Sequence, residues 1–123
     1  MNQKVPHLPC LRLGNPYISL NQSEVVDYRD GTTRATLSQV NPGVIRRDLQ
    51  SISSARKKLQ NFRTQELIEI CHRAGDLFLN ESLPLGSGKH LQSAQEYLET
   101  LSSTSGLPHV MVRRNMEKIH YAL

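Results

Sequence analysis

The residues most able to do chemistry in this sequence lie in the stretch LPLGSGKHLQ, residues 83–92. A phosphate-binding loop needs a glycine five residues before its Gly-Lys pair and a hydroxyl residue directly after it, because the backbone N–H groups cradle the phosphates and the hydroxyl holds Mg²⁺. Here Leu83 takes the place of the early glycine and His90 takes the place of the hydroxyl residue. Such a loop should also follow a buried strand, whereas this one follows a helix-like segment. The pattern therefore predicts a linker between two helices.

The cysteines and histidines form no recognisable reactive set. Cys71 falls on the apolar face of a predicted helix, where a buried thiol behaves as a small hydrophobic side chain. Cys10 lies in a proline-rich segment near His7, a pair that supplies at most two metal ligands. His72 is expected to be half-buried beside the helical face that carries Cys71. The residue types alone thus point to no catalytic, cofactor-binding or metal-binding residue in this chain.

Composition permits nucleic-acid binding but does not favour it. The net charge is +4, and the run ARKKLQNFR, preceded by Arg46 and Arg47, could contact phosphates. The helix predicted to follow this run carries a net charge of −2, so a DNA duplex would repel it. No aromatic residues alternate with the basic ones, as stacking on single strands would require. Nucleic-acid binding is therefore not expected.

Length and hydrophobicity limit the class of protein further. A chain of 123 residues forms one domain or a piece of one. No run of eighteen apolar residues suggests a membrane span, and the first residues, MNQKVPHLPCLRLG, do not resemble a signal peptide. The protein is therefore expected to be cytoplasmic, without a membrane partner.

Two regions are predicted along the chain. Residues 1–23 form an extended arm, because three prolines forbid a regular helix there and the apolar residues show no clean period. Residues 24–123 form a β-hairpin followed by four amphipathic helices. The expected fold class is mainly α with an N-terminal β-hairpin.

The clearest strand signal lies in EVVDYRDGTTRATLSQV, residues 24–40. Asp30-Gly31 predicts the turn of a β-hairpin, because glycine adopts positive φ without strain. Alternation places one apolar pair on a face of each strand: Val26 and Tyr28 before the turn, and Ala35 and Leu37 after it.

Apolar spacing of three and four residues predicts helices over 44–61, 65–79, 94–102 and from Pro108 to the last residue. The short break between the first two predicts an antiparallel helix pair. Ser93 and Glu96 have the spacing of a capping box at the start of the third helix, and Gly106 ends it. The fourth helix stops on apolar Leu123 without a cap or a polar tail. We therefore expect the chain to be the front part of a longer protein.

The order of these elements resembles the amino-terminal region of the aldehyde dehydrogenase superfamily, over about residues 24–82. A turn with glycine (DGT) and a second strand (ATLSQV) form an early hairpin, and two helices follow, RRDLQSISSARKKL and TQELIEICHRAGDLFL. The loop PLGSGKHLQSAQEYL has no counterpart in that pattern. This difference favours a divergent, acyl-CoA-reductase-like branch.

The resemblance implies a function for the whole enzyme and a different role for this segment. Family members oxidise aldehydes to acids, or reduce acyl-CoA, with NAD or NADP and a nucleophilic cysteine. That cysteine and most of the cofactor site come later in the family's chains than residue 123, so neither Cys10 nor Cys71 is the nucleophile by position. This region would build helices around the cofactor domain and help subunits associate, and would bind no cofactor alone.

Two kinds of function thus follow from the sequence. In the first, the chain is an N-terminal piece of an α/β aldehyde-dehydrogenase-like fold, a structural and oligomerising part without the catalytic residues. In the second, it is a small self-contained helical module for protein–protein interaction. In the first, the apolar helix faces are expected to meet the remainder of the same protein or another copy of it; in the second, they are expected to pair with another copy or with a partner.

Overall fold

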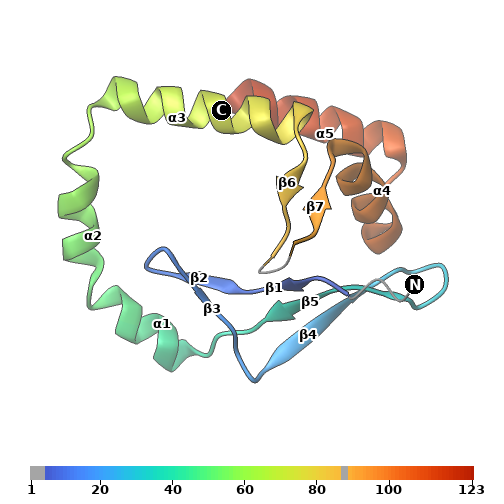
Figure 1. The fold of residues 1–123 in the computed structure, drawn as a ribbon, viewed down its shortest axis with the longest axis horizontal. Coiled ribbons are helices and arrows are strands. Elements are labelled where there is room, and N and C mark those ends of the chain that lie inside the picture. The colour runs from blue at the N-terminus through green and yellow to red at the C-terminus, as the bar shows by residue number, and fades with distance from the viewer. Residues whose placement is uncertain (1–4, 87–88) are drawn as a thin grey trace.

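The computed structural model describes residues 5–86 and 89–123 and shows a mixed α/β architecture. The helices of this part are α1 (Pro42–Leu49), α2 (Ile52–Leu59), α3 (Thr64–Asn80), α4 (Ala94–Ser105) and α5 (His109–Ala122). The strands are β1 (His7–Leu8), β2 (Cys10–Arg12), β3 (Asn15–Tyr17), β4 (Gln22–Val26), β5 (Thr33–Ser38), β6 (Leu83–Pro84) and β7 (Leu91–Gln92). Figure 1 shows them as an open frame, with the strands β1, β4 and β5 along one side and the helices α1, α2 and α3 turning around another. The strand content is larger than the expected mainly α class implies.

The predicted hairpin is confirmed as β4 and β5, which pair in antiparallel fashion. Gly31 in the turn has φ +72°, a conformation that favours glycine. Val25 is the residue opposite Ala35, and the register shifts between Val25 and Val26. Val26 and Tyr28 are exposed, so the apolar pair predicted on the first strand is not the one that packs.

The predicted extended arm forms strands, except that residues 1–4 lie outside the described residues. Strand β1 runs parallel to β5 and gives the sheet its order β1-β5-β4, while β2 and β3 make a separate antiparallel hairpin. Leu13 and Gly14 in the turn of that hairpin both have positive φ, as a two-residue turn requires. These strands are only two or three residues long and contain or adjoin prolines, so the sequence shows no alternation of apolar and polar residues that would predict them.

The first predicted helix, 44–61, is wrong as a single element, because it divides into α1 and α2. The N–H groups of Gln50 and Ser51 bond to carbonyls three residues back, which tightens the chain and ends α1. Serines around this break have low helix propensity. The predicted antiparallel pairing of helices is also wrong, since α2 meets α3 at a corner of the frame (Figure 1).

The remaining helices follow their local signals closely. Helix α3 begins and ends within one residue of its predicted bounds. The capping box of α4 is confirmed: Ser93 Oγ accepts the N–H of Glu96 at 3.1 Å, and the Glu96 carboxylate accepts the N–H of Ser93 at 2.8 Å. Gly106 caps the other end with φ +77°. The predicted linker forms a two-stranded ribbon, β6–β7, and its residues 87–88 lie outside the described part.

The core of the described residues is small and belongs to the helical half. Leu98 of α4 and Val112 and Met116 of α5 are buried against one another. Helix α3 packs along α5, where Asp76 accepts a hydrogen bond from the His120 ring at 2.8 Å. The helices α3, α4 and α5 therefore hold one another, whereas α1 and α2 have no such partner in this part of the chain.

Replacing Gly86 by alanine is expected to detach the β6–β7 ribbon from β1. Gly86 has φ +69°, and a Cβ there would overlap the backbone carbonyl of His7. Strain of this kind costs about 1–3 kcal/mol. Amide exchange of His7, Leu8, Leu83 and Leu85 should accelerate in the variant. Gly14→Ala is the matched control, since its φ is +84° but the space around it is open; equal acceleration in both variants would contradict the contact.

Candidate interaction surface

The most conspicuous surface of the molecule is an apolar stripe on the two unpartnered helices. Its members come from α1, α2 and the turn after them: Ile45, Leu49, Ile52, Leu59 and Phe62. Each of these side chains is between 49% and 59% exposed. Their spacing keeps them on one side of each helix. We call this set the arm stripe.

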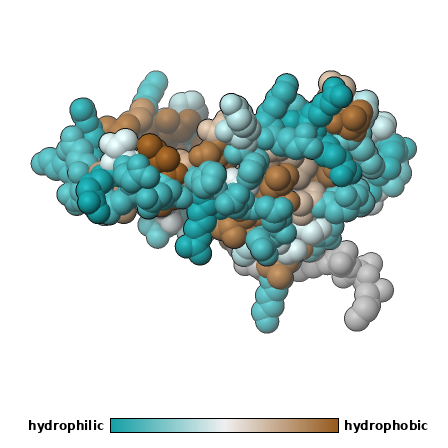
Figure 2. All heavy atoms as spheres, turned by 90° about the horizontal axis from the view of Figure 1, so that it is seen from above, coloured by the Kyte–Doolittle hydropathy of each residue, from teal (hydrophilic) through white to brown (hydrophobic). Residues whose placement is uncertain are grey.

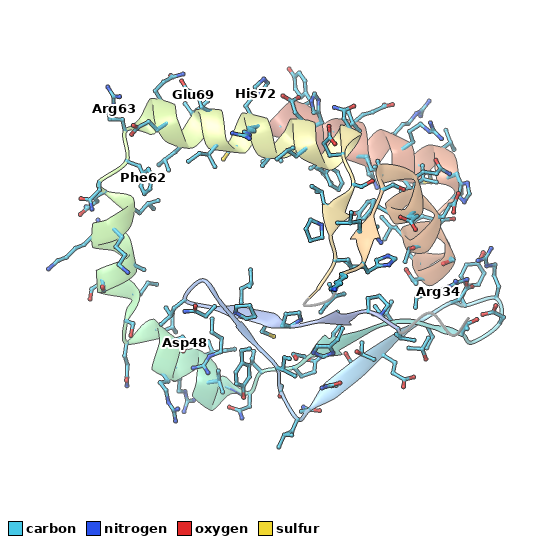
Figure 3. The ribbon with its side chains drawn as sticks, viewed as in Figure 1. Arg34, Asp48, Phe62, Arg63, Glu69 and His72 are labelled. Atoms are coloured by element: carbon cyan, nitrogen blue, oxygen red, sulfur yellow. The ribbon has the colours of Figure 1, made fainter. Side chains whose placement is uncertain are left out.

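Helix α3 continues the exposed apolar surface beyond the corner. Ile70 is 56% and Leu77 is 37% exposed, and the two lie two turns apart on one side of the helix. Figure 3 shows Phe62 pointing towards the enclosed side of the frame, while Glu69 and His72 point away from it. Figure 2 shows apolar patches interrupting the hydrophilic surface when the molecule is seen from above.

The predicted burial of Cys71 and His72 is therefore wrong. Both residues are exposed, although Cys71 lies on the apolar side of α3 as its spacing predicted. The periodicity identified the correct helical side, but the described residues cover that side only near Phe78, which packs against the core of α4 and α5, and leave the Cys71 end open. Cys10 is half-buried, and its thiol donates to the carbonyl of Ser38 at 3.0 Å.

A shallow apolar groove lies where α1 meets the β2–β3 hairpin. It encloses about 280 Å³ between Leu11 and Leu13 of the hairpin side and Ile45, Leu49 and Ile52 of the arm stripe. The groove shows that the hairpin does not fill the apolar side of α1. The arm stripe is thus open at both of its helices.

One ion pair fixes α1 against the hairpin. The guanidinium of Arg12 donates two hydrogen bonds to Asp48, at 2.8 and 2.6 Å, and also stacks 4.8 Å from the centre of the Tyr17 ring. The hydrogen bonds from Arg12 hold the pKa of the Asp48 carboxyl below its ordinary value. A two-pronged pair of this kind fixes orientation as well as distance.

Replacing Asp48 by asparagine is expected to loosen the start of the arm. The variant keeps the shape of the side chain but loses the charge, so the melting temperature at pH 7 should fall by about 3–5 °C. Because the native pKa of Asp48 is lowered, its stabilisation is present above the unfolded pKa of about 4 and is lost as the pH falls further. The melting temperatures of the wild type and of Asp48→Asn should therefore become equal in acid.

Arg46→Gln is the control for this variant, because Arg46 is an exposed charged residue of α1 with no ion-pair partner among the described residues. A gap between wild type and Asp48→Asn that persists unchanged to pH 2 would contradict the role of the pair.

The total surface area is large for a chain of this length. The chain exposes 9746 Å². A compact monomer of 123 residues would expose about 6,700 Å². The excess of roughly 3,000 Å² is comparable to what one subunit buries in a large obligate interface.

Two polar clusters hold the strands together, and sequence reasoning identified neither. Asp27 is fully buried and accepts hydrogen bonds from Arg29 and Arg34. In the second cluster, the ring of His7 lies between two hydroxyls, 2.7 Å from Thr36 Oγ1 and 2.9 Å from Ser38 Oγ. Each cluster joins residues whose proximity depends on strand pairing, so no spacing in the sequence indicates it.

The His7 cluster places an imidazole beside a serine hydroxyl, as a catalytic Ser-His pair does, but this serine is not accessible to a substrate. Ser38 is 7% exposed, and its hydroxyl also accepts the N–H of Ser19 at 3.0 Å. A nucleophile must reach a substrate, and this hydroxyl faces the packed interior of the strand region. The arrangement is therefore that of a structural hydrogen-bond network.

A larger cavity of about 650 Å³ separates the sheet from α4. Arg29 and Arg34 line it, but both are engaged by buried Asp27. The carboxylates of Glu96 and Glu99 line the same space. The cavity is thus lined by side chains that are already engaged: the two arginines share one buried carboxylate, Glu96 caps α4, and Glu99 accepts a hydrogen bond from Gln95.

Two further properties hold for the part of the chain that the structure describes. No three His, Cys, Asp or Glu side chains gather there as a metal site would require. None of its helices is long and apolar enough to cross a bilayer. Comparison of the chain with protein-family models, with curated proteins and with solved structures gives no match.

Proposed function

We propose that this chain is the structural and oligomerising amino-terminal segment of an aldehyde-dehydrogenase-like, NAD(P)-dependent oxidoreductase and contains none of its catalytic residues. The observation that supports this proposal is the uncovered arm stripe, with the large surface area that accompanies it. The hairpin followed by amphipathic helices, over about residues 24–82, supplies the resemblance to that family.

In this proposal the segment acts by positioning other polypeptide. The sheet and the helices α3–α5 form the supporting part, and the Arg12–Asp48 pair sets the angle at which α1 leaves the sheet. The apolar sides of α1, α2 and α3 then contact a cofactor domain or a neighbouring subunit. The nucleophile, the hydride acceptor and the cofactor would all be supplied by that additional polypeptide.

The test has a genetic and an enzymatic part. The reading frame after the codon for Leu123 should encode a glycine-rich turn and, later, a reactive cysteine. The extended protein should oxidise aldehydes with NAD or NADP and lose that activity when the cysteine is replaced. The 123-residue chain should show no turnover, and robust turnover that depends on Cys10 or Cys71 would overturn the proposal. A stop codon directly after Leu123 would do the same.

A second candidate function is the self-contained helical interaction module. The helical half favours it, because α4 carries caps at both ends and α3, α4 and α5 share a core. A module should melt in one cooperative transition as a defined oligomer. A segment of a larger enzyme should melt broadly or aggregate when it is alone.

A further inference from the structure

The arm stripe on α2 has a charged border that indicates what covers it. At 100° per residue, Arg56 lies about 50° from the middle of the stripe formed by Ile52 and Leu59 and borders it, whereas Lys58 lies about 110° and Lys57 about 150° away, towards the opposite side of the helix. No ion pair engages these three cations among the residues that the structure describes. The stripe is therefore an apolar strip with a basic border, and its complement is an apolar strip with an acidic border.

The chain itself carries the complementary charge. Residues 42–63 have a net charge of +5, from six cations against Asp48. Residues 64–106 have a net charge of −4, from six carboxylates against Arg73 and Lys89. The members of the first set are Arg46, Arg47, Arg56, Lys57, Lys58 and Arg63, and the carboxylates are Glu66, Glu69, Asp76, Glu81, Glu96 and Glu99. The boundary between the two signs lies at the corner between α2 and α3.

An exposed apolar side with an acidic neighbour is present on α3. Ile70 and Leu77 are exposed there, and Glu66 lies one turn before Ile70 on the same side of the helix. Because α2 and α3 meet at a corner, they do not lie alongside each other within one chain (Figure 1). A second copy can place its α2 along this α3, and symmetry then makes the same contact twice.

We infer that the arm stripe is covered by a second copy of this chain, in a two-fold dimer in which α2 of each copy packs along α3 of the other. This inference rests on the oligomerising role proposed above and names the partner of that surface. The excess area of roughly 3,000 Å² per copy exceeds the 1,000–2,500 Å² or so that each subunit of an obligate dimer commonly buries, so area does not limit the contact. A bilayer fits the surface less well, because Phe62 points towards the enclosed side of the frame (Figure 3).

Sedimentation equilibrium on the 123-residue chain tests the dimer. The wild type should be dimeric at micromolar concentration. Arg56→Glu places a carboxylate at the border of the stripe twice per dimer, so it should weaken association at least about tenfold. Lys57→Glu, the matched change on the opposite side of α2, should leave the dissociation constant within about twofold. Equal weakening by both variants, or a monomeric wild type, overturns the inference.

Disulfide trapping identifies which copy lies on the stripe. In a Cys10→Ser background, Leu59→Cys adds one thiol to the stripe, and exposed Cys71 on α3 is its expected partner. Oxidation with diamide of a mixture of ¹⁵N-labelled and unlabelled protein should give a disulfide that joins the two isotopes, detected by mass spectrometry. Lys57→Cys is the control and should not cross-link. Pairing only within one isotope overturns the inference.

A vesicle assay tests the main alternative, in which a lipid bilayer rather than a second copy covers the arm stripe. Sedimentation of the chain with phosphatidylcholine–phosphatidylserine vesicles should leave it in the supernatant. Binding that Arg56→Glu abolishes would assign the stripe to an anionic bilayer and overturn the dimer. These experiments test only the dimer. The proposed enzyme role is tested separately, by the reading frame after Leu123.

Discussion

The Leu98→Ala variant is expected to melt at a temperature about 10 °C or more below the wild type. Leu98 is 3% exposed and packs against Val112 and Met116, which with Ala35 are the only fully buried apolar residues of the described part. Truncation of a buried leucine costs about 2–5 kcal/mol, because it removes apolar contact and leaves a cavity. Because the core contains so few buried side chains, no other contact in it compensates for that loss. Far-UV circular dichroism during heating measures the effect.

Leu20→Ala is the matched control, since Leu20 is fully exposed and its truncation removes the same atoms. This variant should melt within about 1–2 °C of the wild type, because surface substitutions usually change stability little. If the two variants melt alike, then the contact of α4 with α5 does not hold the helical half together. A Leu98 variant that loses helix but keeps the His7 hydrogen bonds would show that the strands fold separately.

The features that the sequence could predict are those that depend on neighbouring residues. The turn at Gly31, the capping box of Ser93 and Glu96, and the stop at Gly106 each involve residues within a few positions of one another. Helix α3 is long enough for its apolar period to define its bounds. Such local signals determine the hairpin, α3, α4 and α5 almost completely.

The features that the sequence could not predict depend on contacts between distant segments. Strand β1 exists because it finds β5, and neither its two-residue length nor its prolines indicate a strand. The break between α1 and α2 interrupts an apolar spacing that continues unchanged across it, so the spacing alone predicts one helix. Burial of Cys71 was inferred from its helical side, but burial requires a covering element as well. For the same reason the arm stripe could be located from the sequence while its exposure could not.

Asp27 is the residue on which the docking of the β4–β5 hairpin depends. Its buried carboxylate accepts a hydrogen bond from the Nη2 atom of Arg29 and another from that of Arg34, both at 2.6 Å. Its backbone closes the turn through bonds with Thr32 and Gly31, each 2.8 Å long. The next N–H along the chain, that of Tyr28, donates to a carbonyl of α4 at 3.0 Å. Asp27 therefore joins two cations through its side chain and closes the turn through its backbone, directly beside the contact between sheet and helix.

The Asp27→Asn variant is expected to lower the melting temperature at pH 7 by about 10 °C, since removing one partner of a buried ion pair leaves the others uncompensated. The amide would also present an N–H₂ group to guanidinium groups that can only donate. The exchange of the Tyr28 amide should accelerate, because its bond to α4 depends on the geometry of the turn. Asp30→Asn changes the same functional group at an exposed position three residues away and should have a much smaller effect.

The pH dependence separates the charge of Asp27 from its shape. The hydrogen bonds from Arg29 and then Arg34 hold the pKa of this carboxyl far below its ordinary value. A lowered native pKa stabilises the fold above the unfolded value of about 4, and this stabilisation is lost as the pH falls below it. The wild type should therefore lose stability in acid while Asp27→Asn, already deprived of the charge, loses less. If the two acid-unfolding curves stay parallel down to pH 2, the ionised carboxylate contributes nothing to the docking, and the packing of the turn against α4 must account for it.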